Sequence, residues 1–181
     1  VLIADHTTGD VLAYVGSAGY LDDARWGSID MVKAVRSPGS TLKPIIYGLG
    51  FEQGLIHPET LIEDRPVRFG TYAPKNFDDD FHGTVTIRDA LGQSLNIPAV
   101  KVLNAIGPAK LVARFRRIRI VTALPPRTQP TVAIALGGIG LRLQDLAALY
   151  ASLAIGGEPV KLKMRRDDDR PALAATSREK R

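Results

Sequence analysis

The sequence contains no cysteine, which excludes disulfide bridges and metal sites built on thiolates. It also has no stretch approaching the roughly 18 consecutive apolar residues of a membrane-spanning helix, and no n-region or h-region of a signal peptide. The chain begins at Val1 without a methionine, in a segment that is typical of a strand inside a domain. We therefore expect a fragment of a longer protein, with any targeting or membrane-anchoring segment outside it.

Aromatic residues are scarce, at 6% of the chain, and none occurs from Lys161 to Arg181. This stretch holds eight of the 24 basic residues and four of the 19 acidic ones, which leaves 16 basic against 15 acidic residues elsewhere. A nucleic-acid surface needs basic and aromatic residues together on one folded face. We therefore expect no nucleic-acid partner, and we interpret residues 159–181 as a divergent basic tail that is poorly ordered.

The chain is 45% hydrophobic and 24% charged, which is typical of a globular protein, and we expect residues 1–158 to form one partial domain. A glycine-containing turn between two β-branched stretches predicts an antiparallel hairpin. Thr86 has the character of a helix N-cap, and a long connection with little periodicity precedes it. The predicted segments are strands at 1–5 and 11–17, the connection at 55–83, and helices at 40–53, 87–93, 98–106, 108–118 and 143–155.

Two strands followed by several helices predict an α+β fold, in which a helical cluster covers an antiparallel sheet. Two strands are too few for an independently stable sheet, and no convincing strand follows Gly157. The sheet is therefore expected to be incomplete. Trp26, the only tryptophan, is expected to anchor the core from its polar loop.

Ser40 and Lys43 form an S-x-x-K pattern where a loop becomes a helix. A serine hydroxyl needs a base to become a nucleophile, and residues three apart lie on the same face of a helix. A serine at the helix start also has a backbone N–H that can bind an oxyanion. The lysine can act as the base only when it is neutral, which requires burial or neighbouring cations. The alternative interpretation is an ordinary helix cap, because serine is common there.

A second pattern, "SLN" from Ser94 to Asn96, lies at a break between two predicted helices. A hydroxyl at such a break can relay a proton, and an amide can bind a substrate carbonyl or the lysine. S-x-x-K followed by S-x-N is two of the three motifs of penicillin-binding proteins and serine β-lactamases. The histidines, in contrast, are scattered without metal-ligand spacing, so we expect neither a metal nor another cofactor.

Four longer stretches of the sequence surround or follow these two motifs. They are "RSPGSTLKPIIYGL", "HPETLIEDRPVRFGTYAPKNFD", "FHGTVTIRDALGQSLNIPAV" and "ALGGIGLRLQDLAALYASLAIGG". In this order they resemble the transpeptidase domain of class A penicillin-binding proteins, nearest the 1C-type, from residue 1 to about residue 157.

The resemblance implies a D,D-transpeptidase that crosslinks peptidoglycan stem peptides through a serine acyl-enzyme and is acylated by β-lactam antibiotics. It implies that Ser40 is the nucleophile, Lys43 its base, Ser94 the proton relay, and Asn96 a substrate-binding residue that also positions Lys43. It further implies an extracytoplasmic location, on the periplasmic side of the inner membrane. A membrane anchor and a glycosyltransferase domain would belong to segments outside this chain.

The third motif of the family, Lys-Thr-Gly, does not occur in the sequence. In the family it supplies a cation for the substrate carboxylate and a second oxyanion donor, and losing one such donor costs about 10²- to 10³-fold in rate. Three hypotheses therefore stay open. They are a transpeptidase fragment, a catalytically inactive truncated remnant that acts at most as a binding module, and a serine β-lactamase.

Overall fold

The structure is a computed structural model, and it describes residues 1–164. The predicted tail at 159–181 therefore lies mostly outside the described residues. The chain divides into two compact units, one formed by residues 1–32 with the segment after 146, and the other by residues 33–146. We describe each unit by itself.

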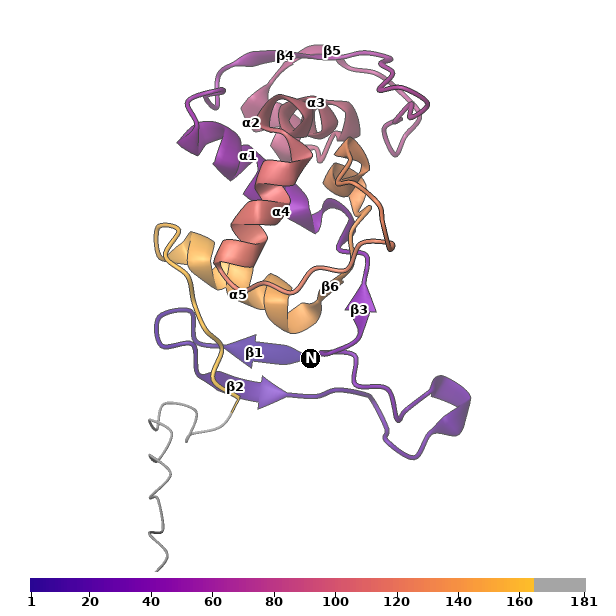
Figure 1. Cartoon of the computed structure of the whole chain (residues 1–181), viewed down its shortest axis with the longest axis vertical. Coiled ribbons are helices and arrows are strands. Elements are labelled where there is room, and N and C mark those ends of the chain that lie inside the picture. Colours follow the sequence, from indigo (N-terminus) through magenta and orange to yellow (C-terminus); the bar gives the residue numbers. More distant parts are fainter. Residues whose placement is uncertain (165–181) are drawn as a thin grey trace, which may run out of the picture. The chain divides into compact units, whose positions relative to one another are not determined.

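Short strands and helices of moderate length alternate along the described chain (Figure 1). The strands are β1 (Leu2–Ala4), β2 (Val11–Tyr14), β3 (Val35–Arg36), β4 (Leu61–Asp64), β5 (Gly83–Thr86) and β6 (Leu141–Arg142). The α-helices are α1 (Lys43–Glu52), α2 (Ile87–Gly92), α3 (Asn96–Ile106), α4 (Pro108–Arg117) and α5 (Leu143–Ala154). The 3-10 helices are η1 (Asp23–Arg25), η2 (Gly39–Leu42) and η3 (Val132–Leu136).

The first unit contains the predicted hairpin. Strands β1 and β2 pair antiparallel, with Leu2 opposite Tyr14, and a parallel bridge joins Asp10 to Lys163. The prediction that Trp26 anchors the core was wrong, because its side chain is 74% exposed. Trp26 has a φ of 55° at the end of η1. The geometry of this turn, and not apolar packing, therefore sets the direction of its side chain.

The second unit has a helical core. Helix α1 packs against α2, α3 and η3, and α3 also packs against α4 and β4. Figure 1 shows α1, α2 and α3 gathered together, with β4 and β5 running alongside them. The core side chains are almost completely buried; they include Leu42, Ile46, Tyr47, Ile97, Val100, Leu103, Leu111, Phe115 and Ile134. This core fixes the helix ends at which the candidate site residues lie.

The helix predicted from Ser40 begins instead as the 3-10 turn η2 and becomes α-helical only at Lys43. The Lys43 backbone N–H donates to the Ser40 carbonyl, three residues earlier. Pro44 has no N–H with which to make the α-helical bond to that carbonyl, so the first turn stays tight. Ser40 and Lys43 nevertheless remain one turn apart at the loop-to-helix junction.

The connection predicted over residues 55–83 contains a strand pair that the sequence interpretation missed. Strands β4 and β5 pair antiparallel from Leu61 opposite Thr86 to Asp64 opposite Gly83. Thr86 then caps α2 as predicted, because its hydroxyl oxygen accepts from the Asp89 backbone N–H. The pair was missed because its strands are separated by 18 residues that contain no regular alternation.

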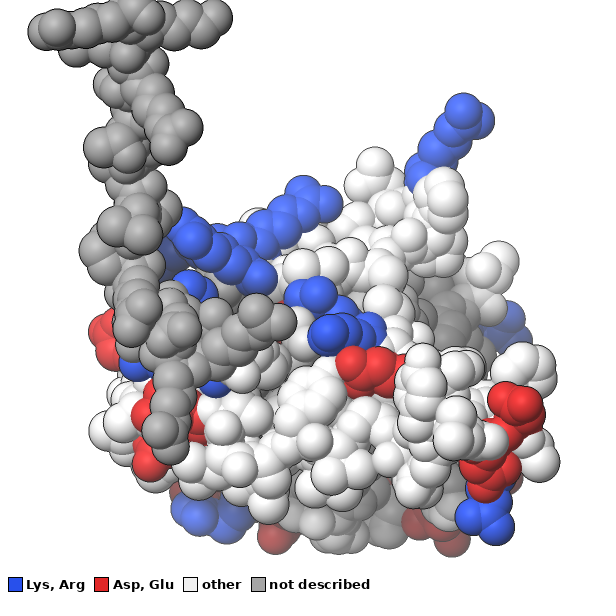
Figure 2. All heavy atoms as spheres, turned by 90° about the horizontal axis from the view of Figure 1, so that it is seen from below, with Lys and Arg blue, Asp and Glu red and all other residues white. Residues whose placement is uncertain are grey.

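The α+β prediction is confirmed, and residues 1–164 contain three two-stranded antiparallel sheets. No helix in this part of the chain is both long and apolar enough to span a membrane. On the face seen in Figure 2, most of the surface carries no formal charge, and acidic and basic side chains are scattered over it.

Candidate active site

Ser40 lies on the exposed side of η2, immediately before α1. Its hydroxyl makes no hydrogen bond within residues 1–164, so it is accessible to a reaction partner. The turn before it is fixed from a distant segment, because the Ser37 hydroxyl donates to the Gly137 carbonyl at 2.8 Å. This bond joins residues 100 positions apart in the sequence and holds the serine turn on η3.

Gly137 permits this contact because it has no side chain. Its φ is 95°, in the region that favours glycine. A Cβ added there would lie 2.3 Å from the Ser37 hydroxyl oxygen and 2.7 Å from the Gly39 backbone nitrogen. The glycine in the "LGG" stretch therefore lets two backbone segments approach closely next to Ser40.

Lys43 is the buried cation of the site. Its side chain is 1% exposed, and its ammonium group Nζ donates to three acceptors. They are the Ser94 backbone carbonyl, the Ser94 hydroxyl at 3.1 Å and the Asn96 Oδ1 at 2.7 Å. The structure therefore brings Lys43, Ser94 and Asn96 together across more than 50 residues of sequence, while Ser40 enters through its backbone bond to Lys43.

Burial lowers the pKa of Lys43 from 10.5 to about 8. The cause is desolvation, since removing the ammonium from water disfavours its charged form. A lysine with such a pKa has an appreciable neutral fraction near neutral pH, and only the neutral amine can accept a proton. The condition that the sequence set for a lysine base, burial of its side chain, is met by the geometry.

Ser94 reaches Lys43 through an unusual helix ending. Helix α2 closes with the Leu95 N–H bound to the Ala90 carbonyl and the Ser94 N–H bound to the Leu91 carbonyl. In this motif the residue after the C-cap is usually a glycine, because it takes a left-handed conformation. Here it is Ser94, with a φ of 56°. That conformation costs about 1 to 2 kcal/mol for a residue with a Cβ, and it accompanies the placement of both Ser94 oxygens against the lysine.

Two buried residues that the sequence interpretation did not select lie behind this cluster. The Asn76 Oδ1 accepts from the Asn96 backbone N–H at 2.8 Å. The Asn76 Nδ2 donates to both carboxylate oxygens of Asp64, at 3.0 and 2.8 Å. Asp64 is 0% exposed and Asn76 is 5% exposed. Asn76 lies in the polar stretch "PKNFD" and Asp64 ends the stretch "LIED", and polar residues of this kind are exposed more often than buried.

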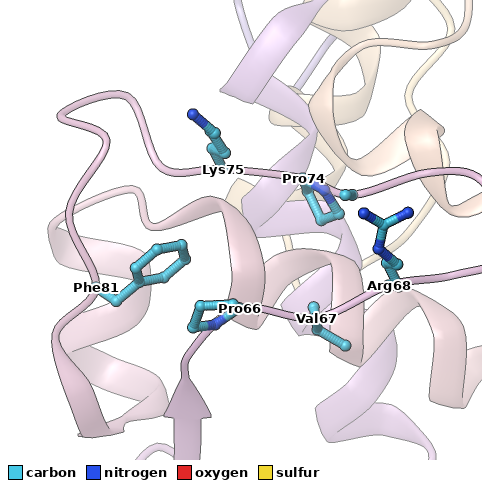
Figure 3. Close-up of a pocket in the computed structure, with 7 residues that line it drawn as sticks. Pro66, Val67, Arg68, Pro74, Lys75 and Phe81 are labelled. Atoms are coloured by element: carbon cyan, nitrogen blue, oxygen red, sulfur yellow. The ribbon is translucent and has the colours of Figure 1, made fainter.

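An open hollow of about 500 Å³ lies beside the segment that contains Asn76 (Figure 3). Its walls are mostly apolar, with Pro66, Pro74 and Phe81, and two cations, Arg68 and Lys75, stand among them. The hollow adjoins the lysine cluster through one residue, because the Lys75 backbone carbonyl accepts from the Asn96 Nδ2 at 2.7 Å. Among the described residues no group of acidic and histidine side chains is arranged to hold a metal ion.

The family comparison covers most of the chain. The family model described as "Penicillin binding protein transpeptidase domain" matches residues 1–172. The chain belongs to the penicillin-binding protein transpeptidase family. The match includes the S-x-x-K and S-x-N segments and extends into the basic tail.

Relatives of the family match most of the chain. This chain is 44% identical to penicillin-binding protein 1C of Escherichia coli (strain K12) over 178 residues, which are 97% of its length. It is 33% identical to penicillin-binding protein 1F of Bacillus subtilis (strain 168), over 94% of this chain. The match spans 23% of the length of each of these two relatives.

Solved structures of penicillin-binding proteins share the fold. Penicillin-binding protein 1A from Haemophilus influenzae superposes with a TM-score of 0.74 at 24% identity, over 87% of this chain and 24% of that one. The PonA1 protein from Mycobacterium tuberculosis, in complex with penicillin V, gives a TM-score of 0.72 at 24% identity. It covers 84% of this chain and 42% of PonA1. These likenesses establish the α+β transpeptidase fold.

Proposed function

We propose that residues 1–158 form the part of a D,D-transpeptidase domain that carries the nucleophile and its base, and that Ser40 is acylated by peptidoglycan stem peptides and by β-lactams. The observation that supports this most directly is the buried Lys43 amine. The amine is bound to Ser94 and Asn96, and Lys43 follows one turn after Ser40, which is exposed. A structural helix cap would not require a desolvated lysine there, because an exposed ammonium costs less.

In the proposed acylation step, the neutral Lys43 amine takes the proton of the Ser40 hydroxyl. The Ser40 oxygen attacks the carbonyl carbon of the penultimate D-Ala, and the Ser40 backbone N–H stabilises the resulting oxyanion. When the carbon–nitrogen bond breaks, Ser94 relays a proton to the leaving nitrogen. The terminal D-Ala departs and an ester remains on Ser40.

In the second step, an amine of a neighbouring stem peptide attacks the ester carbon. A new amide bond forms and the ester bond breaks. The proton that the attacking amine loses passes through the Lys43 and Ser94 pair to the Ser40 oxygen. Asn96 would bind the substrate amide through its Oδ1 once the lysine releases that oxygen. The family acts on the cell wall outside the cytoplasm, so the proposed reaction takes place on the periplasmic side of the inner membrane.

The experiment incubates the folded 181-residue chain with a fluorescent penicillin and measures the intact mass with time. Since the sequence contains no Lys-Thr-Gly motif, we expect acylation to be slower by about 10²- to 10³-fold than with a complete oxyanion site. We therefore expect a stable adduct at long incubation times. Its mass equals that of the chain plus the intact penicillin, because ring opening releases no leaving group.

Ser40→Ala is expected to abolish the adduct, whereas Ser28→Ala, which removes another exposed hydroxyl, should leave it unchanged. Rapid hydrolysis of the penicillin without a persistent adduct would favour a β-lactamase instead. A folded chain that forms no adduct at all would contradict the catalytic proposal and favour an inactive remnant.

A further inference from the structure

The first turn of α3 obtains its cap from a distant side chain. The backbone N–H groups at a helix start have no partners within the helix, and Leu95, the N-cap of α3, offers no side-chain acceptor. The Asn76 Oδ1 fills this place at 2.8 Å from the Asn96 nitrogen. A residue 20 positions earlier in the sequence therefore fixes the backbone from which the Asn96 side chain extends.

The Asn96 side chain is held by the same segment. Its Nδ2 donates to the Lys75 backbone carbonyl at 2.7 Å, and its Oδ1 accepts from the Lys43 Nζ at 2.7 Å. Residues 75 and 76 together thus hold Asn96 by its backbone and by its amide nitrogen. The nitrogen of the Asn96 amide is bound to residue 75, so its oxygen faces Lys43. The segment therefore orients Asn96 so that it offers a hydrogen-bond acceptor to the lysine.

Asp64 in turn decides which way the Asn76 amide faces. A carboxylate accepts hydrogen bonds and cannot donate them, so the NH₂ end of Asn76 must face Asp64 and the oxygen must face α3. The Asn76 Nδ2 also donates to the Asp80 carbonyl at 2.9 Å, and the Asp64 Oδ2 accepts from the His82 N–H at 2.8 Å. Every member of this buried network is satisfied, which makes its geometry stiff.

We propose that Asn76, oriented by Asp64, is a positioning residue that holds the Asn96 oxygen against the Lys43 amine. The role in catalysis rests on the proposed function, whereas the positioning itself does not. The alternative is that Asn76 only ties its loop to the helical core. In that case its removal would lower the stability of the fold without changing the environment of the Lys43 amine.

The titration of Lys43 separates these two roles. An acceptor bound to the ammonium stabilises the charged form, so withdrawal of the Asn96 oxygen lowers the lysine pKa further. The charged groups on the elements around α1 include the buried Asp64 and several exposed pairs, and Asn76→Ala and Asn96→Ala leave all of these charges in place, so they do not account for a difference between the variants. These pairs are Asp89 with Thr86, Arg88 with Glu59, Lys101 with the Glu63 carbonyl, Lys75 with Asp79, and Glu52 with Arg114.

The experiment follows the pH titration of lysine side-chain carbons by NMR in the 181-residue chain, and Lys43 is assigned by the signal that Lys43→Met removes. Asn76→Ala is expected to lower the Lys43 midpoint by about 0.5 to 1 pKa unit, the worth of one hydrogen bond. Asn96→Ala should shift it in the same direction. Asn104→Ala, an exposed asparagine on the same helix, should leave it unchanged.

Asp64→Asn tests the orienting step and provides a second variant if Asn76→Ala does not fold. It keeps the side-chain shape but allows the Asn76 amide to turn over, so the midpoint should fall in the same direction. Loss of the carboxylate charge acts in that direction as well, so an unchanged midpoint is the decisive outcome for this variant. An unchanged Lys43 midpoint in a folded Asn76→Ala or Asp64→Asn chain would overturn the proposal. An unchanged midpoint in Asn96→Ala would do so as well. None of these readouts depends on penicillin, so a chain that fails to acylate leaves the test intact.

Discussion

Apolar side chains are used in opposite ways in two regions of the molecule. One region is the pair of helices α1 and α3, which carry Lys43 and Asn96, and the other is the N-terminal 32 residues. In α3, seven of 11 residues are buried, among them Leu103 at 0% exposure. In residues 1–32, Leu12 is 69% exposed, Leu21 is 89% exposed and Trp26 is 74% exposed. This contrast shows where a buried amine can be held, because only a densely packed region can desolvate a lysine and still satisfy its hydrogen bonds.

Lys43 provides the most direct test of that contrast. Lys43→Met keeps an unbranched side chain but removes the amine, so penicillin labelling should fall by about 10²- to 10⁴-fold, the usual contribution of a general base. Lys110→Met, at an exposed lysine on α4, should have no effect. The labelling rate of the unmodified chain should rise with pH through about 8 and then level off, because only the neutral amine takes the proton. A labelling rate that does not change with pH across this range would contradict the assignment of the base.

The same lysine links stability to pH with a defined sign. Its pKa is about 8 in the folded chain, against the ordinary lysine value of 10.5 that applies to the unfolded chain. Between these values the unfolded state binds the additional proton, so the stability contributed by Lys43 rises with pH across this window. The difference in urea unfolding free energy between the unmodified chain and Lys43→Met should therefore shift in favour of the unmodified chain as the pH rises from about 8 to 10.5.

A matched pair of leucines tests the packing difference itself. Leu103→Ala is expected to destabilise the fold by about 2 to 5 kcal/mol, since it opens a cavity between α3 and its neighbours. Leu12→Ala should change stability by less than about 0.5 kcal/mol, as is usual for an exposed site. Urea unfolding measures both. Equal effects would remove the contrast between the two regions.

Tyr47 provides the test with the smallest expected effect. Its side chain is 0% exposed, and its hydroxyl has no hydrogen-bond partner within the described residues. Burial and the charge of Asp64 raise its pKa. Tyr47→Phe removes an unsatisfied polar group, so the free energy of urea unfolding should stay within about 1 kcal/mol or increase. A loss above about 2 kcal/mol would indicate that the hydroxyl is bonded after all.

Local sequence was informative where short-range contacts decide the structure. The hairpin and the cap of α2 at Thr86 were predicted, because each depends on neighbours within a few residues. The helix predicted from Ser40 was found as well, but its first turn is a 3-10 turn and it becomes α-helical only at Lys43. The assignment of Ser40, Lys43, Ser94 and Asn96 stays a prediction as regards their roles in catalysis. The structure adds that three of the four are in direct contact.

The β4–β5 pair, Asp64 and Asn76 were not predictable from local patterns. Strand pairing across an 18-residue excursion depends on non-local contacts, and a buried asparagine in a polar loop looks like any exposed one. The expectation for Trp26 failed for a related reason. An aromatic residue anchors a core only where other elements surround it, and the first 32 residues do not enclose this side chain.

The order of amino acids was enough to set the residue types, the succession of elements and the spacing that places a serine one turn before a lysine. Tertiary packing was needed to remove the Lys43 side chain from water and to turn Ser94 toward it in a left-handed conformation. It was also needed to place Asn76 and Asp64 behind Asn96. The physical reason is that desolvation and hydrogen-bond satisfaction depend on groups far apart in the chain. A motif records which groups are present, but packing decides their protonation and direction.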